Sequence, residues 1–438
     1  MIKNPDEALS LLESLPKYDV KPGLSRINYL LESLNNPEEN FASIHIGGSN
    51  GKGSVLALLS GVLSRKYRVG EFVSPPLVSF SDRIKVDGEG IEGSSLVEGV
   101  THLEGPLEEL RERGDPPSLF EAATALGAWY FQEKDIDLAL METGLGGRYD
   151  ATNPVGRPLL TTVTSVDLEH QNLLGQTLEE IAGELAGLAK PGRPLVIGPS
   201  GESTEGVFQT ECRKKECEVF FADREVNLEL LEFDWEGSRF AVKDSPIDHL
   251  VGGKVEIGLP GSYQKNNLST ALSSLAHLNN TDFSVEPGEI TSGLKEAKWP
   301  GRFQLLRRDP HFLVDGAHNE AASAVLAKEL KRYGELRPEN HDKFLVFSAL
   351  KDKDLGGMLG KLGNVSDRTY LTELDHRRGV PLGGLETAAS QLDLDYRLVS
   401  EPREAFKIVK EEAKPEDLIC VTGSLYLVRE AILSDIRR

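Results

Sequence analysis

The sequence is poor in cysteine, with only Cys212, Cys217 and Cys420 among 438 residues. Four residues separate the first two, and no pair of histidines stands near them. This spacing excludes a disulfide framework and argues against a structural zinc site. We therefore expect a protein of the cytoplasm.

Long apolar runs and excess positive charge are also missing. No stretch approaches the roughly 18 apolar residues of a spanning helix, and residues 1–20 carry acids where a signal peptide would be apolar. Lys and Arg number 49 against 70 Asp and Glu, and the resulting formal charge of −21 would repel nucleic acid and anionic membranes. We expect small-molecule partners and a monomer.

The composition otherwise suits packed cores, because 39% of the residues are hydrophobic and 27% are charged. A single core rarely grows beyond roughly 250 to 300 residues, so a chain of this length should form two domains. We place the junction at the Trp-Pro-Gly segment 299–301. The predicted domains are residues 1–298 and 299–438.

Apolar, β-branched runs bounded by Gly, Pro and Asn predict buried strands. In the first half these are residues 41–46, 137–143, 159–166 and 194–198. Helical spacing follows the first of them at 54–66, and Thr177 with Glu180 forms a capping box before a helix that should stop at 190–192. Further strands are expected at 311–316, 343–350, 369–374, 396–400 and 417–423. Their alternation with helices predicts a parallel sheet covered by helices.

The segment GGSNGKGS at 47–54 lies between a predicted strand and a predicted helix. Its glycines let backbone N–H groups approach an anion, and Lys52 adds a positive charge at the helix N-terminus. A strict P-loop would have Gly at Ile46 and Ser or Thr at Gly53, so this is a variant. The alternative is a glycine-rich turn with a solvated lysine. The predicted nucleotide-binding residues are Asn50, Gly51, Lys52, Gly53 and Ser54.

The loop and its flanks, HIGGSNGKGSV, resemble the folylpolyglutamate synthase branch of the Mur ligase superfamily. The family's other segments follow in order: SPPLVSFSDRI at 74–84, FEAATALGAWYF at 120–131, ETGLGGRYDATN at 142–153, TSVDLEHQNLLGQTLEEIA at 164–182, GSYQKNNLSTAL at 261–272, WPGRFQLL at 299–306, DGAHN at 315–319 and VTGSLYLV at 421–428. The resemblance covers nearly the whole chain. It implies an α/β fold with an N-terminal P-loop-type ATPase domain, built on a mainly parallel sheet, and a smaller Rossmann-like C-terminal domain.

The resemblance also assigns roles to residues outside the loop. Ser74, Glu142 and His170 match the family's Mg²⁺ ligands, and Asn267, Arg302 and Asp315 match its ATP contacts. His318 matches a residue that handles the amino acid or phosphate, and with Lys52 it is the predicted catalytic pair. Read without the family, Glu142 is a strand-end acid that can face a ligand or simply water. His170 alone would be a packed or solvated histidine.

Two segments fall where the family binds its pteroate-type acid. The predicted substrate-binding residues are Ser118, Leu119, Phe120, Glu121, Tyr149, Asp150 and Ala151. An aromatic such as Phe120 is more often part of a core. The carboxylate of Asp150 could accept two hydrogen bonds from a pterin's amino face.

The chain departs from the family pattern at four positions. Ser49 and Pro76 are mild changes that remove no metal ligand, and Tyr263 stands where a His usually precedes the retained Gln264. Leu185 stands where the family has a lysine that becomes carbamylated, and leucine cannot supply carbamate oxygens. Its neighbour Glu184 is offset by about 100° around a helix and would point elsewhere.

These residues predict a ligase that uses ATP and Mg²⁺ to add L-glutamate to dihydropteroate, to folate (poly)glutamates or to both, through an acyl phosphate. One alternative is a Mur-type ligase for another acid, although a nucleotide-linked precursor calls for a domain ahead of the loop at residue 47. The other alternative is a relative that binds ATP but has no catalytic activity, and the leucine at position 185 leaves this alternative open. Against a silent relative stand the family's site residues that this chain keeps: Lys52, Ser74, Glu142, His170, Arg302 and Asp315.

Overall fold

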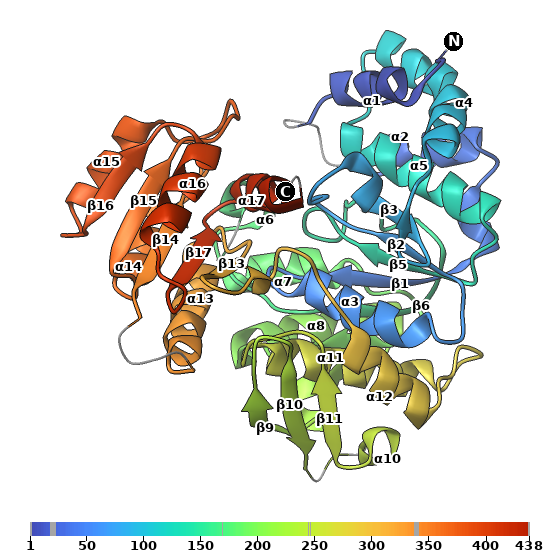
Figure 1. The fold of residues 1–438 in the computed structure, drawn as a ribbon. Coiled ribbons are helices and arrows are strands. Elements are labelled where there is room, and N and C mark those ends of the chain that lie inside the picture. Colours follow the sequence, from blue (N-terminus) through green and yellow to red (C-terminus); the bar gives the residue numbers. More distant parts are fainter. Residues whose placement is uncertain are drawn as a thin grey trace. The chain divides into compact units, whose positions relative to one another are not determined.

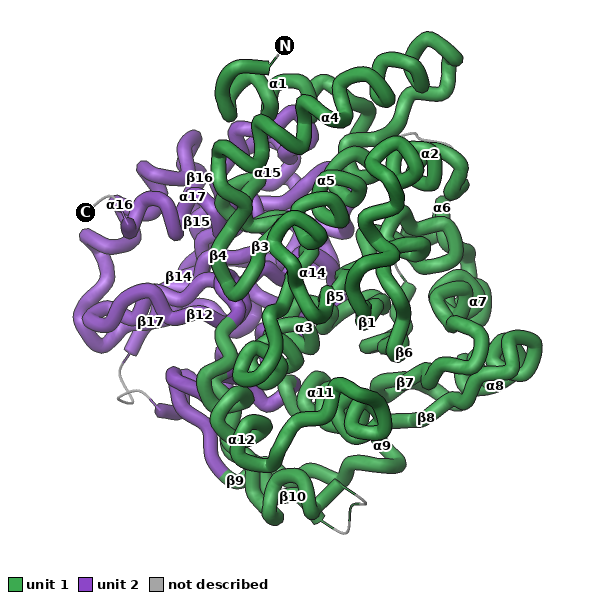
Figure 2. Tube along the Cα trace, turned by 90° about the vertical axis from the view of Figure 1, so that its right-hand side faces the viewer, with its two compact units in different colours: residues 1–231, 239–258, 264–298 green, residues 232–238, 259–263, 299–438 purple. Residues whose placement is uncertain are grey.

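The computed structural model describes residues 2–17, 23–168, 170–243, 245, 247–336 and 341–436. The chain forms two compact units. The first contains residues 1–231, 239–258 and 264–298, and the second contains residues 232–238, 259–263 and 299–438 (Figure 2). The second unit is therefore assembled from three separate stretches of sequence.

A mainly parallel sheet forms the centre of the first unit (Figure 1). Its strands are β1 (Ala42–Gly47), β2 (Val69–Phe72), β3 (Ile84–Val86), β4 (Glu89–Gly90), β5 (Leu138–Glu142), β6 (Arg157–Val163), β7 (Leu195–Ile197) and β8 (Val219–Phe221). Within the described residues their order is β4-β3-β2-β5-β1-β6-β7-β8, and only β3 and β4 run antiparallel to their neighbours. The carboxyl ends of β2, β5, β1 and β6 therefore meet at one edge.

Helices cover this sheet because their apolar residues need burial. The longer ones are α1 (Pro5–Ser14), α2 (Ser25–Ser33), α3 (Lys52–Leu63), α4 (Gly93–Glu112), α5 (Leu119–Glu133), α7 (Leu178–Ala186), α8 (Glu202–Lys215), α11 (Gln264–Leu278) and α12 (Pro287–Glu296). The short ones are η1 (Pro37–Asn40), η2 (Phe80–Arg83), α6 (Gln171–Leu174), α9 (Ala222–Glu225) and α10 (Asp248–Val251). Helix α3 packs against α11 and α12, α7 packs against α8, and α1, α2, α4 and α5 form one layer with a shared apolar core.

A separate small sheet has the order β11-β10-β9 (Figure 1). Its strands are β9 (Leu228–Phe233), β10 (Ser238–Val242) and β11 (Lys254–Ile257). Residues 232–238, which include the end of β9, the turn and the first residue of β10, belong to the second unit. The sequence analysis predicted none of these three strands.

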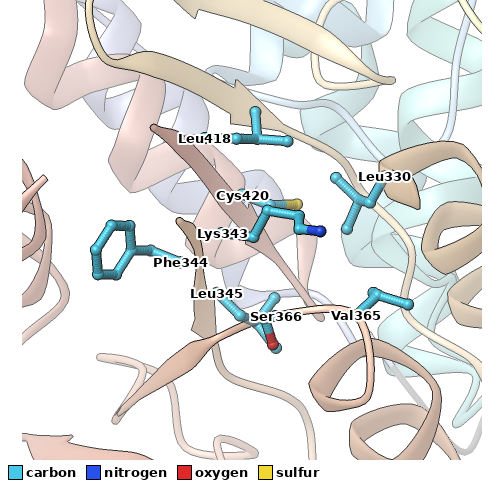
Figure 3. A pocket seen from close by; sticks show the side chains of 8 residues that line it. All are labelled: Leu330, Lys343, Phe344, Leu345, Val365, Ser366, Leu418 and Cys420. Atoms are coloured by element: carbon cyan, nitrogen blue, oxygen red, sulfur yellow. The ribbon is translucent and has the colours of Figure 1, made fainter. Parts of the chain in front are cut away.

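The second unit is a sheet with helices on its faces. Its elements are β12 (Gln304–Arg307), β13 (His311–Val314), α13 (Glu320–Gly334), β14 (Lys343–Phe347), α14 (Leu355–Gly363), β15 (Arg368–Thr372), α15 (Leu382–Ser390), β16 (Tyr396–Val399), α16 (Pro402–Glu412), β17 (Leu418–Thr422) and α17 (Leu425–Ile436). Among the described residues the order is β12-β13-β17-β14-β15-β16, with β12 alone antiparallel. A cavity of about 10 Å³ in its core has room for one water at most (Figure 3).

The structure confirms the predicted fold class and every predicted strand. The capping box of Thr177 and Glu180 is also confirmed, since each side chain accepts from the other residue's backbone N–H. The helix it begins ends at Ala186, with Gly187 at its C-cap, four residues before the predicted stop at Lys190. In the described part of the chain, no helix has the length and apolar character needed to cross a bilayer.

Candidate active site

The glycine-rich loop lies at the carboxyl end of β1, between the neighbouring ends of β5 and β6. Gly48 has φ of 126° and Gly51 has φ of 90°, a region that disfavours residues with a side chain. A Cβ built on Gly48 would lie 2.3 Å from Thr164 Oγ1, and one on Gly51 would lie 2.3 Å from Asn267 Oδ1. The predicted ATP contact Asn267 thus lies against the loop, and both glycines are sterically required.

The segment that follows β6 holds this loop in shape. The backbone N–H of Ser49 donates to Ser165 O at 3.0 Å, and that of Asn50 donates to Ser165 Oγ at 2.9 Å. The side-chain amide of Asn50 (Nδ2) also donates to Asp167 Oδ2 at 2.9 Å. Sequence reasoning did not assign a role to Ser165 or Asp167, although both stand in the family segment TSVD.

Lys52 begins α3 and folds back over the loop. Its Nζ donates to Gly48 O at 2.6 Å and to Ser49 O at 3.3 Å. The N-terminus of a helix of this length attracts anions, and the ammonium adds a full positive charge there. The arrangement is chemically suited to bind a polyphosphate.

Glu142 and Ser74 meet at the same edge of the sheet. Glu142 ends β5 and is 5% exposed, while Ser74 lies two residues beyond β2. The Ser74 backbone N–H donates to Glu142 Oε2 at 3.1 Å. Two of the three predicted Mg²⁺ ligands are therefore adjacent, and both offer the oxygen atoms that this ion prefers.

His170 is exposed and precedes the short helix α6 with φ of 46°. Nothing in the described residues gathers three His, Cys, Asp or Glu side chains into a metal-binding group. Two large apolar side chains near it in sequence, Leu168 and Leu173, are 55% and 68% exposed. The structure thus leaves this third predicted ligand at the surface, beyond the end of β6.

The first predicted acid-binding segment, residues 118–121, begins α5. Ser118 and Glu121 form a capping box, in which Glu121 Oε2 accepts from Ser118 N at 2.7 Å and from Ser118 Oγ at 2.8 Å. Glu121 Oε1 accepts from Arg26 Nε at 2.9 Å, and Arg26 also pairs with Asp115 at 3.0 Å. The Glu121 carboxylate therefore anchors the segment to α2. Sequence reasoning missed Arg26, because only the fold shows its burial.

The second segment is a turn organised around Asp150, which is 5% exposed. Its Oδ2 accepts from the N–H groups of Gly144 and Leu145, each at 2.9 Å, and its Oδ1 accepts from Thr152 N at 3.0 Å and Thr152 Oγ1 at 2.6 Å. Burial raises the pKa of this carboxyl, against the lowering effect of these bonds. Four donors occupy the roughly four lone-pair sites of a carboxylate.

The other members of the two acid-binding segments differ in exposure. Tyr149 is 54% exposed and Ala151 is buried. A Cβ built on Gly144 would lie 2.7 Å from Phe120 Cζ, so the Phe120 ring rests on the glycine-rich turn. The turn and the start of α5 are therefore in contact.

His45 lies beneath this turn, with its Nε2 2.7 Å from Thr152 O. It is fully buried, and burial together with the charge of Lys190 lowers its pKa to about 3. Lys190 Nζ donates to Asn153 O at 2.5 Å and also to the Asn153 side chain. Burial and the charge of Lys215 lower the pKa of Lys190 to about 8.

The buried His45 predicts a loss of stability in mild acid. Between pH 6.5 and pH 3 the unfolded chain binds a proton at this position that the folded chain does not, so stability falls as the pH falls. From pH 7 to pH 5 the contribution is about 2 kcal/mol. Urea unfolding of the wild type and of His45→Gln at both pH values checks it, since the carboxylates titrate alike in both. Equal losses in the two proteins would contradict the prediction.

Leu185 lies in an apolar cluster with Val163, Ile181 and Ala182, and it is 2% exposed. Its Cδ2 would lie 3.6 Å from a Cβ built on Gly47, at the start of the glycine-rich loop. Position 185 is therefore close to the loop, but its leucine side chain offers no metal ligand.

In the second unit, Asp315 follows β13 and is 7% exposed. Its Oδ2 accepts from Phe303 N at 2.7 Å and its Oδ1 from Ala317 N at 2.8 Å. Burial raises the pKa of this carboxyl, and the charge of Arg302 opposes that effect. Arg302 Nη1 would lie 2.6 Å from a Cβ on Gly316, so the structure brings these two predicted ATP contacts together.

The predicted catalytic residue His318 lies two residues beyond Gly316 in the same unit. Its Nδ1 lies 2.8 Å from Gly316 O, so one ring nitrogen is held by the turn that follows Asp315. Loop glycines and the carboxyl ends of parallel strands surround this turn. Such an edge is the usual ligand-binding region of open α/β sheets.

A larger cavity, about 250 Å³, lies elsewhere in the first unit. Its lining includes Glu225, His249, His277 and Asn280. The His277 and Glu225 side chains are 3.0 Å apart. None of the predicted site residues lines it.

Residues 301–425 match the family described as the Mur ligase, glutamate ligase domain. Dihydrofolate synthase/folylpolyglutamate synthase of Bacillus subtilis is 32% identical over 446 residues, which cover 99% of this chain and 98% of that protein. Folylpolyglutamate synthase of Thermotoga maritima has a similar structure, with a TM-score of 0.84, 32% identity and coverage of 98% and 96%. Escherichia coli FolC, solved in complex with DHPP and ADP, has a TM-score of 0.85, 28% identity and coverage of 100% and 99%.

Proposed function

Because this chain belongs to the dihydrofolate synthase/folylpolyglutamate synthase family, we propose that it joins L-glutamate to dihydropteroate, to folates or to both, using ATP. The observation that carries the proposal is that three parts of the site lie at one edge of the large sheet. The phosphate-binding loop, the Ser74–Glu142 contact and the Asp150-centred turn all lie there, at the ends of β1, β2 and β5. An ATPase that activates a carboxylate needs a loop that binds the phosphates, an acidic side chain that holds the metal ion, and a surface that binds the acid substrate.

ATP would bind with its phosphates at the glycine-rich loop, where the α3 N-terminus and the Lys52 ammonium supply positive charge. The two carbonyl groups that Lys52 now contacts, of Gly48 and Ser49, are weak partners for an ammonium compared with a phosphate. Lys52 would therefore turn to the transferred phosphoryl group. Asn50, Gly51, Gly53, Ser54 and Asn267 would complete the site, with Arg302 and Asp315 as further ATP contacts.

Mg²⁺ fits the donors present, because a serine hydroxyl and a buried carboxylate are hard oxygen ligands. Ser74 and Glu142 would hold it, and His170 would be the third ligand. When bound, the ion supplies positive charge that neutralises the phosphates. The chain's own residues bind and orient the substrates.

A carboxylate is a poor electrophile, so the acid must be activated before an amine can attack it. The acid's carboxylate oxygen attacks the γ-phosphorus of ATP, and ADP leaves. The amino group of glutamate then attacks the carbonyl carbon of this acyl phosphate, and inorganic phosphate leaves as a proton is lost from nitrogen. Lys52 would offset charge in the first step, and His318 would position the amino acid or the phosphate.

The acid would lie against residues 118–121 and the turn 144–151. Since both carboxylates of these segments are occupied by the protein's own donors, Glu121 and Asp150 would shape the site. Phe120 and the exposed Tyr149 would offer aromatic surface to a pterin or benzoate ring.

The decisive experiment offers dihydropteroate and tetrahydrofolate separately, each with ATP, Mg²⁺ and L-glutamate, and follows products by mass spectrometry. A glutamylated product from either acid supports the proposal, and the pattern of products identifies the acid and the chain length. ATP binding without a product from either acid would favour a silent relative. A product from a different acid alone would favour a Mur-type ligase of other specificity.

Leu185 predicts that activity does not depend on bicarbonate. A carbamate forms reversibly between CO₂ and a neutral lysine amine, and the leucine at this position has none. We expect turnover to stay within about twofold when bicarbonate is removed and restored. Reversible loss of turnover would show that another lysine, with Lys190 the nearest candidate, carries a carbamate. Its amine already donates to Asn153, which argues against that role.

The proposed setting is the cytoplasm, with the protein acting as a monomer. All three cysteines lie in the described residues, and each is a free thiol there. Free thiols are usual in a reducing compartment. Sedimentation at micromolar concentration would test the monomer.

A further inference from the structure

Arg83 is a buried cation that the function proposed above does not use. It ends η2, in the connection between β2 and β3, and its side chain is 6% exposed. Its Nη1 donates to Val73 O at 3.4 Å, a long hydrogen bond. Its Nε–H has no hydrogen-bond acceptor among the residues that the structure describes.

Two aromatic rings and one acid surround the Arg83 guanidinium. The guanidinium carbon lies 5.8 Å from the centroid of the Phe72 ring and 5.7 Å from that of Phe120. Burial lowers the pKa of Arg83 to about 10, and the charge of Glu142 opposes that effect. Arg83 therefore remains charged at neutral pH.

An unsatisfied donor in this setting is costly. A buried N–H without an acceptor destabilises a protein by about 1–3 kcal/mol, and more when the group is charged. Native proteins rarely keep such a group unless a ligand or water completes it. The rings of Phe72 and Phe120 offer no strong acceptor, so a ligand anion is the natural partner.

The position of Arg83 indicates which anion accepts this hydrogen bond. Arg83 contacts Phe120 of the acid-binding segment, whose ring rests on Gly144 of the turn. Its Nη1 also donates to the carbonyl of Val73, the residue before the proposed metal ligand Ser74. It therefore lies between the acid-binding residues and the proposed metal ligands. The reacting carboxylate of the acid must occupy that region to reach the phosphates.

We propose that Arg83 binds the reacting carboxylate of the acid substrate through its Nε–H, an inference that rests on the proposed function. Arginine suits this task because its planar fork matches a carboxylate. Its charge also offsets the repulsion between the acid's carboxylate and the ATP phosphates as they approach. The flanking rings favour an acid whose carboxylate is carried on an aromatic ring.

The test compares the wild type with Arg83→Gln and Arg83→Lys. We expect Arg83→Gln to raise the KM for the acid by about 10- to 100-fold, with the KM for ATP and the Mg²⁺ requirement within about threefold of wild type. The KM of Arg83→Lys for the acid should lie between the values of the wild type and Arg83→Gln. Arg113→Gln is the matched control, because Arg113 also lies over an aromatic ring, 4.7 Å from the Tyr29 centroid, but at the surface.

A ligand-side comparison separates carboxylate binding from general damage. Wild type should bind the acid about tenfold or more tightly than its carboxamide, and Arg83→Gln should lose that preference. A higher Mg²⁺ requirement with an unchanged KM for the acid would overturn the proposal and show that Arg83 only orients Glu142. If Arg83→Gln does not fold, a crystal structure of the wild type with the acid decides, since Nε must lie within about 3.2 Å of a carboxylate oxygen. A wild type that makes no product with any acid refutes the proposed function, whereas an active wild type with unchanged acid binding in Arg83→Gln refutes this inference alone.

Discussion

Replacing Lys52 by alanine is expected to lower turnover by about a hundredfold or more. The ammonium of Lys52, at the start of α3, lies directly on the glycine-rich loop, where its Nζ donates to the carbonyls of Gly48 and Ser49. Its proposed contact with the transferred phosphoryl group strengthens as charge develops there. Steady-state kinetics with saturating acid and glutamate measure the effect.

Lys254→Ala is the control for Lys52→Ala, because Lys254 is an exposed lysine on β11. It should leave turnover unchanged. Thermal unfolding should show both variants folded, since Lys52 contributes little to the core. Turnover of Lys52→Ala within threefold of the wild type would remove the loop from the catalytic site.

Gly48→Ala is expected to reduce kcat/KM for ATP by about a hundredfold or more and to destabilise the first unit by about 2–4 kcal/mol. Two effects combine at this position. The backbone has φ of 126°, and a Cβ would lie 2.3 Å from Thr164 Oγ1 and 2.8 Å from Thr164 N. The second contact is with backbone, which cannot turn aside, so the loop itself must move.

Gly114→Ala isolates the backbone effect. Gly114 also has positive φ, 73°, but a Cβ there would meet nothing within 4 Å. It should cost about 1 kcal/mol and leave activity intact. If Gly48→Ala behaves like Gly114→Ala in both urea unfolding and kinetics, the site does not require close packing of the loop against the segment that follows β6.

Local pattern was enough to predict the regular elements. The strands β1, β5, β13 and β17 are mostly apolar and are buried along their whole length, and short apolar runs of this kind predict buried strands. The glycine-rich loop was equally readable, because its glycines and lysine are adjacent in sequence. Ser74 and Glu142 were both assigned as Mg²⁺ ligands from the resemblance, and the Ser74 N–H donates to the Glu142 carboxylate.

The residues that the sequence could not reveal act through distant partners. Arg26 and Glu121 are 95 positions apart, and their contact exists only after α2 has packed on α5. Arg83 stood inside a segment noted for its family likeness, yet nothing local shows that an arginine will be buried between two rings. The Asp150 carboxylate was expected to meet a ligand, and the structure shows four internal donors around it.

The small sheet β11-β10-β9 was missed for a different reason. Its strands carry mixed exposed and buried residues, so they lack both the continuous apolar run and the clean alternation that predict a strand. Phe233 at the end of β9 and Trp235 just after it pack against the core of the second unit. No pattern in residues 232–238 could show that they belong with residues 299–438.

That discontinuity limits how the protein can be dissected. Trp235 lies 4.8 Å from the Tyr333 ring and 6.2 Å from the Phe303 ring, and Gly261 N donates to Tyr333 Oη at 3.0 Å. A gene fragment that begins at residue 299 would lack both partners and would expose the aromatic core that they cover. A domain exchange between relatives at this junction would likewise import a core without its matching inserts. An exchange of the second unit must therefore take residues 232–238 and 259–263 from the same parent as residues 299–438.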